Sequence, residues 1–210
     1  MKALKYFGHQ KFQKFLSSLR DVKKEKVRFV DNIYPHRGYL MNYGAFPQTW
    51  EDPKFIDPNV GFGGDNDPLD VCDVGNPLLR MGQIVQVKPL GALALVDENE
   101  ADWKIIVINS KDQNFNEINS LGDFHSKRPG LLQDIVRWFT NYKVPQGKPF
   151  NTLAFNSKLQ NAEVATKMTL SFYATQTHLF QLLPIFRLPL ISAFISPNHR
   201  NKNMHDGFNS

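Results

Sequence analysis

Residues 91–108 read GALALVDENEADWKIIVI, and this stretch indicates the fold class. Its two apolar runs, at 91–96 and 103–108, are short and rich in residues that favour strands. An acidic run at 97–102 separates them, so the stretch predicts a strand pair capped by an acidic turn. Taken alone, that acidic run also has the composition of an ordinary solvated hairpin.

Outside this stretch, strand signals come first and helix signals follow. Further β-prone runs lie at 27–30, 69–74 and 83–87, with Gly and Pro between them. A helix is predicted at 129–142, where Pro129 suits the first turn and apolar residues form one stripe. A second helix is predicted around 159–168. This order predicts an α+β, mainly β, fold: a small barrel with helices packed outside it.

The composition fits one well-buried globular domain, because the chain has 210 residues of which 41% are hydrophobic and 21% charged. Cys72 is the only cysteine, which excludes an internal disulfide or a cysteine zinc site and favours a reducing compartment. The six histidines lack H-x-x-x-H and H-E-x-x-H spacing. A bound metal is therefore expected to be a hard, oxygen-coordinated cation.

The net charge of +5 is unevenly distributed along the chain. Residues 1–20 carry five basic and no acidic groups, whereas residues 21–168 carry 17 basic and 19 acidic groups. The central part is slightly acidic and its acids cluster, which suits cation capture and argues against direct nucleic-acid binding.

Both ends of the chain differ in character from the centre. Residues 6–19 predict a short basic amphipathic helix, with a mitochondrial presequence as the alternative. Residues 179–195 are apolar but include Pro184, Arg187 and Pro189, so we expect no membrane span. The sequence thus divides into an extension (1–20), a core (21–168) and an apolar, basic tail (169–210).

The sharpest chemical signal is residues 64–70, GDNDPLD, which place three carboxylates directly before a strand. Converging carboxylates repel by about 1 kcal/mol at roughly 4 Å in water, and more when buried, so they favour a cation between them. Asp65 and Asp67 would share one face if the stretch is extended. An EF-hand is excluded because its sixth and twelfth positions hold Asp70 and Asn76. A solvated acidic turn remains the simpler alternative.

Several separated segments resemble the eukaryotic-type soluble (family I) inorganic pyrophosphatases, in the family's order. The matching segments are YPHRGY (34–39), NYGAFPQTWEDP (42–53), GDNDPLDV (64–71), DENEADWK (97–104), WFTNYKVP (138–145) and GKP (147–149). The resemblance covers residues 21–168. It implies a small, distorted five-stranded OB-like barrel with flanking helices, and Mg²⁺-dependent hydrolysis of inorganic diphosphate to two phosphates by metal-activated water. It also implies a homodimer in the cytoplasm, with mitochondria or the nucleus as alternatives.

Residue roles follow from the resemblance, position by position. Metal binding is assigned to Asp65, Asp70, Asp97 and Asp102. Catalysis is assigned to Asp67, Arg28 and Lys104. Substrate binding is assigned to Arg28, Tyr39, Tyr43, Lys104, Tyr142, Lys143 and Lys148. In this arrangement, cations of the protein stand among the acids, as a site for a metal-bridged polyanion requires.

The sequence departs from the family in two places. The family's N-terminal hairpin, with its E-I-P-R-like run, is not recognisable in residues 1–20, which leaves the completeness of the barrel open. Phe150 stands where the family has glutamate. These departures favour an alternative function: a catalytically impaired paralogue that acts as a binding protein or as a subunit of a chromatin-remodelling complex.

Overall fold

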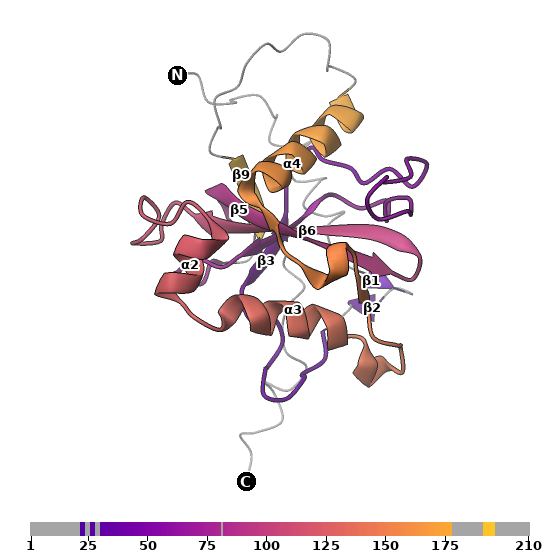
Figure 1. Cartoon of the computed structure of the whole chain (residues 1–210), viewed down its shortest axis with the longest axis horizontal. Helices are drawn as coiled ribbons and strands as arrows, with labels where there is room; N and C mark the ends of the chain where they lie inside the picture. Colours follow the sequence, from indigo (N-terminus) through magenta and orange to yellow (C-terminus); the bar gives the residue numbers. More distant parts are fainter. Residues whose placement is uncertain (1–21, 24–25, 28–29, 81, 178–190, 196–210) are drawn as a thin grey trace.

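The computed structural model describes residues 22–23, 26–27, 30–80, 82–177 and 191–195. Figure 1 shows a curled β-sheet at the centre of this part of the chain, with helices on more than one side. The basic helix expected at 6–19 lies outside the described residues, as does Arg28. Those two predictions therefore remain untested.

Five strands form the central sheet: β3 (Asn42–Ala45), β4 (Asp70–Asp73), β5 (Ile84–Asp97), β6 (Glu100–Asn109) and β9 (Ile191–Ile195). Two short strands extend it beside β5: β7 (Thr152–Leu153) and β8 (Gln160–Asn161). A separate two-stranded ribbon consists of β1 (Val22–Lys23) and β2 (Lys26–Val27).

The pairings of the five central strands run in a cycle. Strand β3 pairs with β4, β4 with β6, β6 with β5, β5 with β9, and β9 with β3; only β4 and β6 are parallel. The contact between β3 and β9 has just two aligned residue pairs. The sheet is therefore a small barrel that closes only weakly at one seam, in agreement with the predicted mainly β, OB-like fold with flanking helices.

The strand pair predicted from residues 91–108 is the β5–β6 hairpin. Its tight turn contains Glu98 and Asn99, both with positive φ angles (49° and 70°), a geometry that matches the twist of paired strands. The runs predicted separately at 83–87 and 91–96 form one long strand, with an irregular register between Pro89 and Gly91. Strand β3 was not predicted.

Within the described residues, three α-helices flank the sheet: α2 (Leu121–Lys127), α3 (Leu131–Asn141) and α4 (Ala162–Thr177). The prediction of α3 is confirmed, although Gly130 is its N-cap and Pro129 precedes it. The second predicted helix was wrong in its bounds: Gln160 and Asn161 pair with β5, and the Asn161 side chain accepts a hydrogen bond from the amide of Val164. Helix α2, capped by Ser120, was not predicted.

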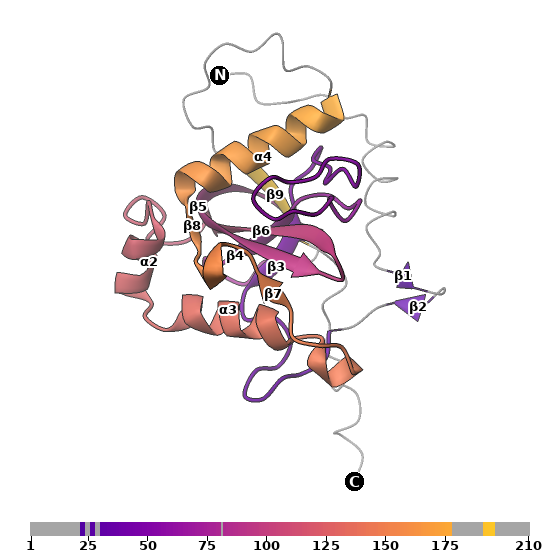
Figure 2. The same cartoon turned by 45° about the vertical axis from the view of Figure 1, so that its right-hand side comes forward.

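Side chains of β5 and β6 alternate between two apolar cores, as the period of a strand requires. Leu93 and Ile106 pack on the side of α3, whereas Ala94 and Ile105 pack on the side of α4. Figure 2 shows α3 and α4 on opposite sides of the sheet. The strands are apolar on both faces because a helix covers each.

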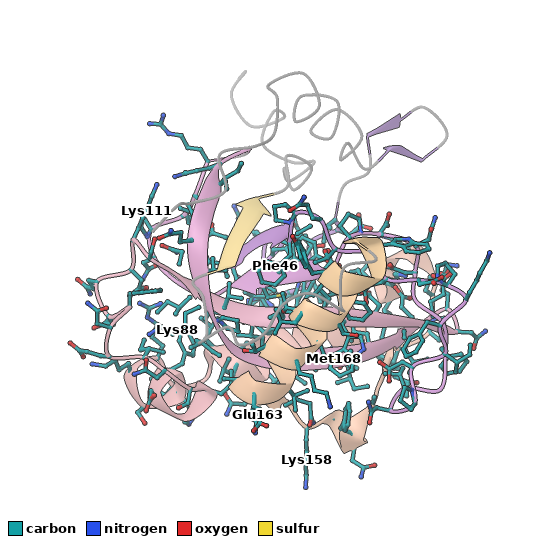
Figure 3. The ribbon with its side chains drawn as sticks, turned by 90° about the horizontal axis from the view of Figure 1, so that it is seen from above. Phe46, Lys88, Lys111, Lys158, Glu163 and Met168 are labelled. Carbon is teal, nitrogen blue, oxygen red and sulfur yellow. The ribbon has the colours of Figure 1, made fainter. Side chains whose placement is uncertain are left out.

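The α4-side core joins segments that are distant in sequence. Phe46, which follows β3, and Met168 of α4 belong to this core and are labelled in Figure 3, where α4 crosses the sheet. None of the helices in the described part of the chain combines the length and apolar composition that crossing a bilayer needs.

The seam predicts that the backbone of β9 contributes to stability. Phe194 aligns with Ala45 of β3 on one side and with Ile84 of β5 on the other. Phe194→Pro removes a backbone donor within the ladder, whereas Phe194→Val changes the side chain and keeps that donor. We expect the proline variant to lose about 1–3 kcal/mol of unfolding free energy relative to the valine variant, measured by urea denaturation. Equal unfolding curves would contradict the observed pairing.

Candidate active site

Asp70 of β4 and Asp97 of β5 lie on one face of the sheet, at one end. Cys72 and Leu95 belong to the core beside α3. Asp70 stands two residues before Cys72, and Asp97 stands two residues after Leu95. Because side chains alternate along a strand, both carboxylates fall on the face that α3 covers, at the edge where the apolar core ends.

Strand β6 adds two more charged side chains to the same face. Asp102 and Lys104 precede the core residue Ile106 with the same spacing of two. The parallel register aligns Lys104 with Asp70, and the antiparallel register aligns Asp102 with Leu95. Three strands thus bring residues from distant parts of the chain together.

Lys104 is the central cation of this cluster. Its side chain is only 4% exposed, and its Nζ donates to Asp102 (2.5 Å) and to Asp70. The hydroxyl of Tyr43 donates to the same Asp70 oxygen. Tyr39 stacks on Tyr43 with ring centroids 4.3 Å apart, so the two tyrosines form an aromatic wall beside the ion pairs.

The C-terminal end of α3 contributes the second cationic group. Lys143 donates to both carboxylate oxygens of Asp97, one of them at 2.5 Å, and Tyr142 donates to Asp97 at 3.3 Å. Lys148 lies farther out, exposed, and contacts Glu98 at 2.6 Å. The acidic turn is therefore paired with the basic segment that follows α3.

The loop before β4 carries Asp65 and Asp67, and the two do not share a face of an extended strand. The condition for a shared face, an extended chain, is not met because Asn66, between them, adopts φ 70° and turns the chain. The turn is closed by the Asp65 side chain, which accepts a hydrogen bond from the amide of Asp67 (2.9 Å). Asp65 is partly buried, whereas Asp67 is exposed.

Glu51 is a further acidic member of the site that the sequence reasoning did not assign. Its Oε1 accepts a hydrogen bond from the amide of Trp103 (3.1 Å), and its buried Oε2 has no partner among the described residues. Carboxylate oxygens of Glu51, Asp65 and Asp102 lie within 4.8 Å of one another. Its position in the motif 42–53 was the one available signal, since no spacing rule links it to Asp65.

Glu51 fits closely against the loop because of Gly64. A Cβ at position 64 would lie 2.4 Å from the carbonyl carbon of Glu51, closer than real contacts allow. Two hydrogen bonds between backbones hold the segments together: Glu51 N donates to Asp67 O, and Asn66 N donates to Glu51 O, both at 3.0 Å.

The three clustered acids have raised pKa values. Burial, reinforced by the charge of Asp102, raises the pKa of Asp65 to about 8. Burial also raises the pKa of Asp102 to about 6, although Lys104 opposes the shift. The pKa of Glu51 rises for the same reason, burial first and then repulsion by Asp65. Without a bound cation, the ionised forms of these three carboxylates are therefore less stable than they would be in water.

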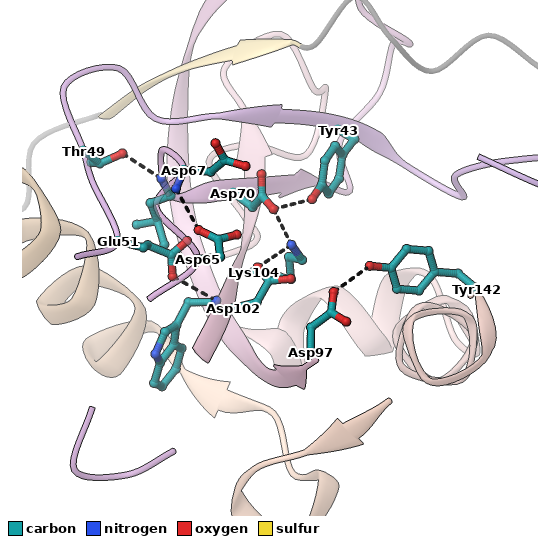
Figure 4. Close-up of polar contacts among 12 residues, drawn as sticks. Tyr43, Thr49, Glu51, Asp65, Asp67, Asp70, Asp97, Asp102, Lys104 and Tyr142 are labelled. Atoms are coloured by element: carbon teal, nitrogen blue, oxygen red, sulfur yellow. Dashed lines mark hydrogen bonds and ion pairs between the residues drawn. The ribbon is translucent and has the colours of Figure 1, made fainter. Parts of the chain in front are cut away.

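A divalent cation fits this donor set. The cluster offers only carboxylate oxygens, the ligands that Mg²⁺ and Ca²⁺ prefer, and one of those oxygens is buried without a hydrogen-bond partner in the described part of the chain. Figure 4 shows Asp67 and Asp70 beside this cluster, with Asp97 and Tyr142 across from it. The structure thus gathers every described residue that the sequence assigned to the site, with Lys148 at its outer rim.

Comparison with known proteins identifies the family. The model of the inorganic pyrophosphatase family matches residues 13–175. The chain belongs to the inorganic pyrophosphatase family. Inorganic pyrophosphatase 1 of Caenorhabditis elegans is 51% identical over 149 residues, which are 71% of this chain and 35% of that protein.

Solved structures of pyrophosphatases share the fold. The inorganic pyrophosphatase of Schistosoma japonicum has a TM-score of 0.73 and 42% identity, over 82% of this chain and 60% of that one. A truncated Trypanosoma cruzi vacuolar soluble pyrophosphatase in complex with PPi has a TM-score of 0.69 and 32% identity, over 78% of this chain and 60% of that one. The chain spans between 35% and 55% of the length of the curated pyrophosphatases it resembles.

The raised pKa of Asp65 predicts how the stability of the metal-free protein depends on pH. An aspartate in an unfolded chain titrates at roughly 3.9, whereas Asp65 in the fold titrates at about 8. Between these values the folded state binds more protons, so the free energy of unfolding falls as the pH rises. In EDTA, the melting temperature should decrease from about pH 5 to about pH 8, and Asp65→Asn should make the decrease shallower.

Asp134→Asn is the matched control for this measurement. Asp134 lies on α3, forms an exposed i,i+3 ion pair with Arg137, and takes no part in the cluster. Its variant should keep the slope of the unmodified protein. Identical slopes for Asp65→Asn and the control would show that Asp65 does not cause the pH dependence.

Proposed function

We propose that this chain hydrolyses inorganic diphosphate to two phosphates in a reaction that depends on Mg²⁺. The observation that carries the proposal is the cluster of Glu51, Asp65 and Asp102 oxygens within 4.8 Å, next to Lys104 and Lys143. Family membership supports the same reaction. The related trypanosomal enzyme in complex with PPi supports the substrate.

Mg²⁺ would be held by the carboxylates of Glu51, Asp65, Asp70, Asp97 and Asp102. When bound, Mg²⁺ supplies charge neutralisation of the diphosphate and a more acidic water at neutral pH. The low exposure of Asp102 (4%) keeps bulk water from screening the interaction.

The lysines and tyrosines would hold the phosphate oxygens. Lys104 and Lys143 are paired with carboxylates, so a cation on those carboxylates would leave both ammonium groups available to the polyanion. Tyr142 stands beside Lys143, and Tyr39 and Tyr43 line the pocket. We assign Arg28 and Lys148 to the same task on the strength of the family resemblance.

Asp67 would take the proton from the attacking water. It is exposed and follows Asp65 by two residues, so it can reach solvent that lies next to the acidic cluster. A positioned carboxylate is a suitable general base for such a step. Charge on the departing phosphate would be stabilised by Lys104, Lys143 and Arg28.

We also propose a domain organisation, an oligomeric state and a cellular location for this chain. Residues 21–168 would form the catalytic core, flanked by an extension (1–20) and a tail (169–210). A homodimer in the cytoplasm follows from the resemblance to eukaryotic-type members, with mitochondria or the nucleus as alternatives.

Asp67→Asn tests the proposed reaction directly. Because the amide cannot accept the proton, phosphate release from Mg²⁺ diphosphate should fall by about a hundredfold or more. Asp134→Asn should release phosphate at the rate of the unmodified chain. Full turnover by Asp67→Asn would remove Asp67 from the mechanism.

The same assay separates the enzyme from its alternative. An unmodified chain that binds Mg²⁺ and diphosphate in calorimetry but releases no phosphate above the Asp67→Asn level would contradict the proposed hydrolysis. That outcome would favour a catalytically impaired paralogue with a binding role.

A further inference from the structure

Asp57 is a buried aspartate that lies outside the motifs of the family resemblance and outside the proposed site. It stands in the loop of residues 52–64, which leads directly into Asp65, and it is only 4% exposed. A buried carboxylate is costly unless its oxygens are hydrogen-bonded. Its partners therefore indicate what the residue does.

Asp57 organises its own loop. Its Oδ1 accepts hydrogen bonds from the amides of Asn59 (2.7 Å) and Val60 (3.2 Å). Its backbone N–H donates to Phe62 O (2.9 Å), and its carbonyl accepts from the amide of Gly61 (2.7 Å). The loop is thus folded around this one side chain.

The second oxygen of Asp57 reaches strand β6. Its Oδ2 accepts a hydrogen bond of 2.9 Å from the indole Nε1 of Trp103, which is fully buried. Trp103 lies between Asp102 and Lys104 in sequence. Since side chains alternate along the strand, the indole belongs to the α4-side core while its two neighbours face the site.

The loop and the strand are joined at two further points. The amide of Trp103 donates to Glu51 at 3.1 Å, and the amide of Ala101 donates to the carbonyl of Gly63 at 2.7 Å. These contacts bracket the segment that ends at Asp65. Of these contacts, the Asp57–Trp103 hydrogen bond is the one made by a side chain of the α4-side core, on the face opposite Asp102 and Lys104.

We propose that Asp57 is a positioning residue that, through the Trp103 indole, sets Asp65 of the loop against Asp102 of β6 so that both bind one divalent cation. This inference rests on the proposed function for the identity of the cation. Asp57 itself touches neither substrate nor metal.

Calorimetric titration with Mg²⁺ alone, beside thermal unfolding, tests the proposal. In Asp57→Asn, the side chain has one acceptor oxygen and one NH₂ donor group. If the oxygen accepts from the loop amides, the NH₂ group faces the indole N–H, and two donors cannot form a hydrogen bond. Trp103→Phe keeps an aromatic ring and removes the indole donor. Each variant should weaken Mg²⁺ binding by about tenfold to a hundredfold. The double variant should be little weaker than either, because both changes break one interaction.

Asp112→Asn is the matched control. Asp112 is equally buried (4% exposed), accepts from an amide two residues on, Asn114 N at 2.8 Å, and also binds Arg128 at 2.6 Å. It follows the other end of β6, so its variant should lower the melting temperature without changing Mg²⁺ affinity.

The outcomes distinguish this inference from the proposed function. Unchanged Mg²⁺ affinity in the folded Asp57→Asn and Trp103→Phe proteins overturns the positioning role, even if the unmodified chain releases phosphate. Weakened affinity in both, with no phosphate release by the unmodified chain, upholds the positioning role and overturns the hydrolysis. A chain that binds no Mg²⁺ overturns both.

Discussion

The alternation of side chains along β6 is the constraint on which the site depends. Asp102 and Lys104 face the proposed site, while Trp103 between them anchors the strand from the opposite core. Any shift by one residue would exchange these faces and bury the two charged groups among apolar side chains. The long hairpin with β5 and the parallel pairing with β4 hold this register.

Electrostatics explains why such a register is compatible with a stable fold. The carboxylates repel one another, and two lysines partly offset that repulsion by pairing with three aspartates. Burial, together with the repulsion that remains, raises the pKa values of Glu51 and Asp65. A bound cation would take the place of the lysines as the partner of the carboxylates. A phosphate anion bound with it would take the place of the carboxylates as the partner of the lysines.

Much of this could be predicted from the sequence, for identifiable physical reasons. The β5–β6 hairpin and α3 carry strong local patterns, and the acids at 65–70 and 97–102 stand out by their density. The turn at Asn66 was not predicted because a left-handed residue leaves no trace in hydrophobic periodicity. Glu51 was not assigned because its role arises from contact with Trp103, 52 residues away. Strand β9 was not predicted because its place beside β3 and β5 depends on the tertiary fold.

The sequence distances within the site have a consequence for how the protein acquires its native state. Asp70 and Lys104 are 34 residues apart, Asp57 and Trp103 46, and Asp97 and Lys143 also 46. Such contacts close long loops, which makes them late and slow events in folding. The β5–β6 hairpin alone carries only Asp97 and Asp102 of the five proposed ligands, and the other three come from segments before it. Occupancy of the acidic cluster would therefore report that the whole barrel has assembled, and cation availability would act on the native population alone.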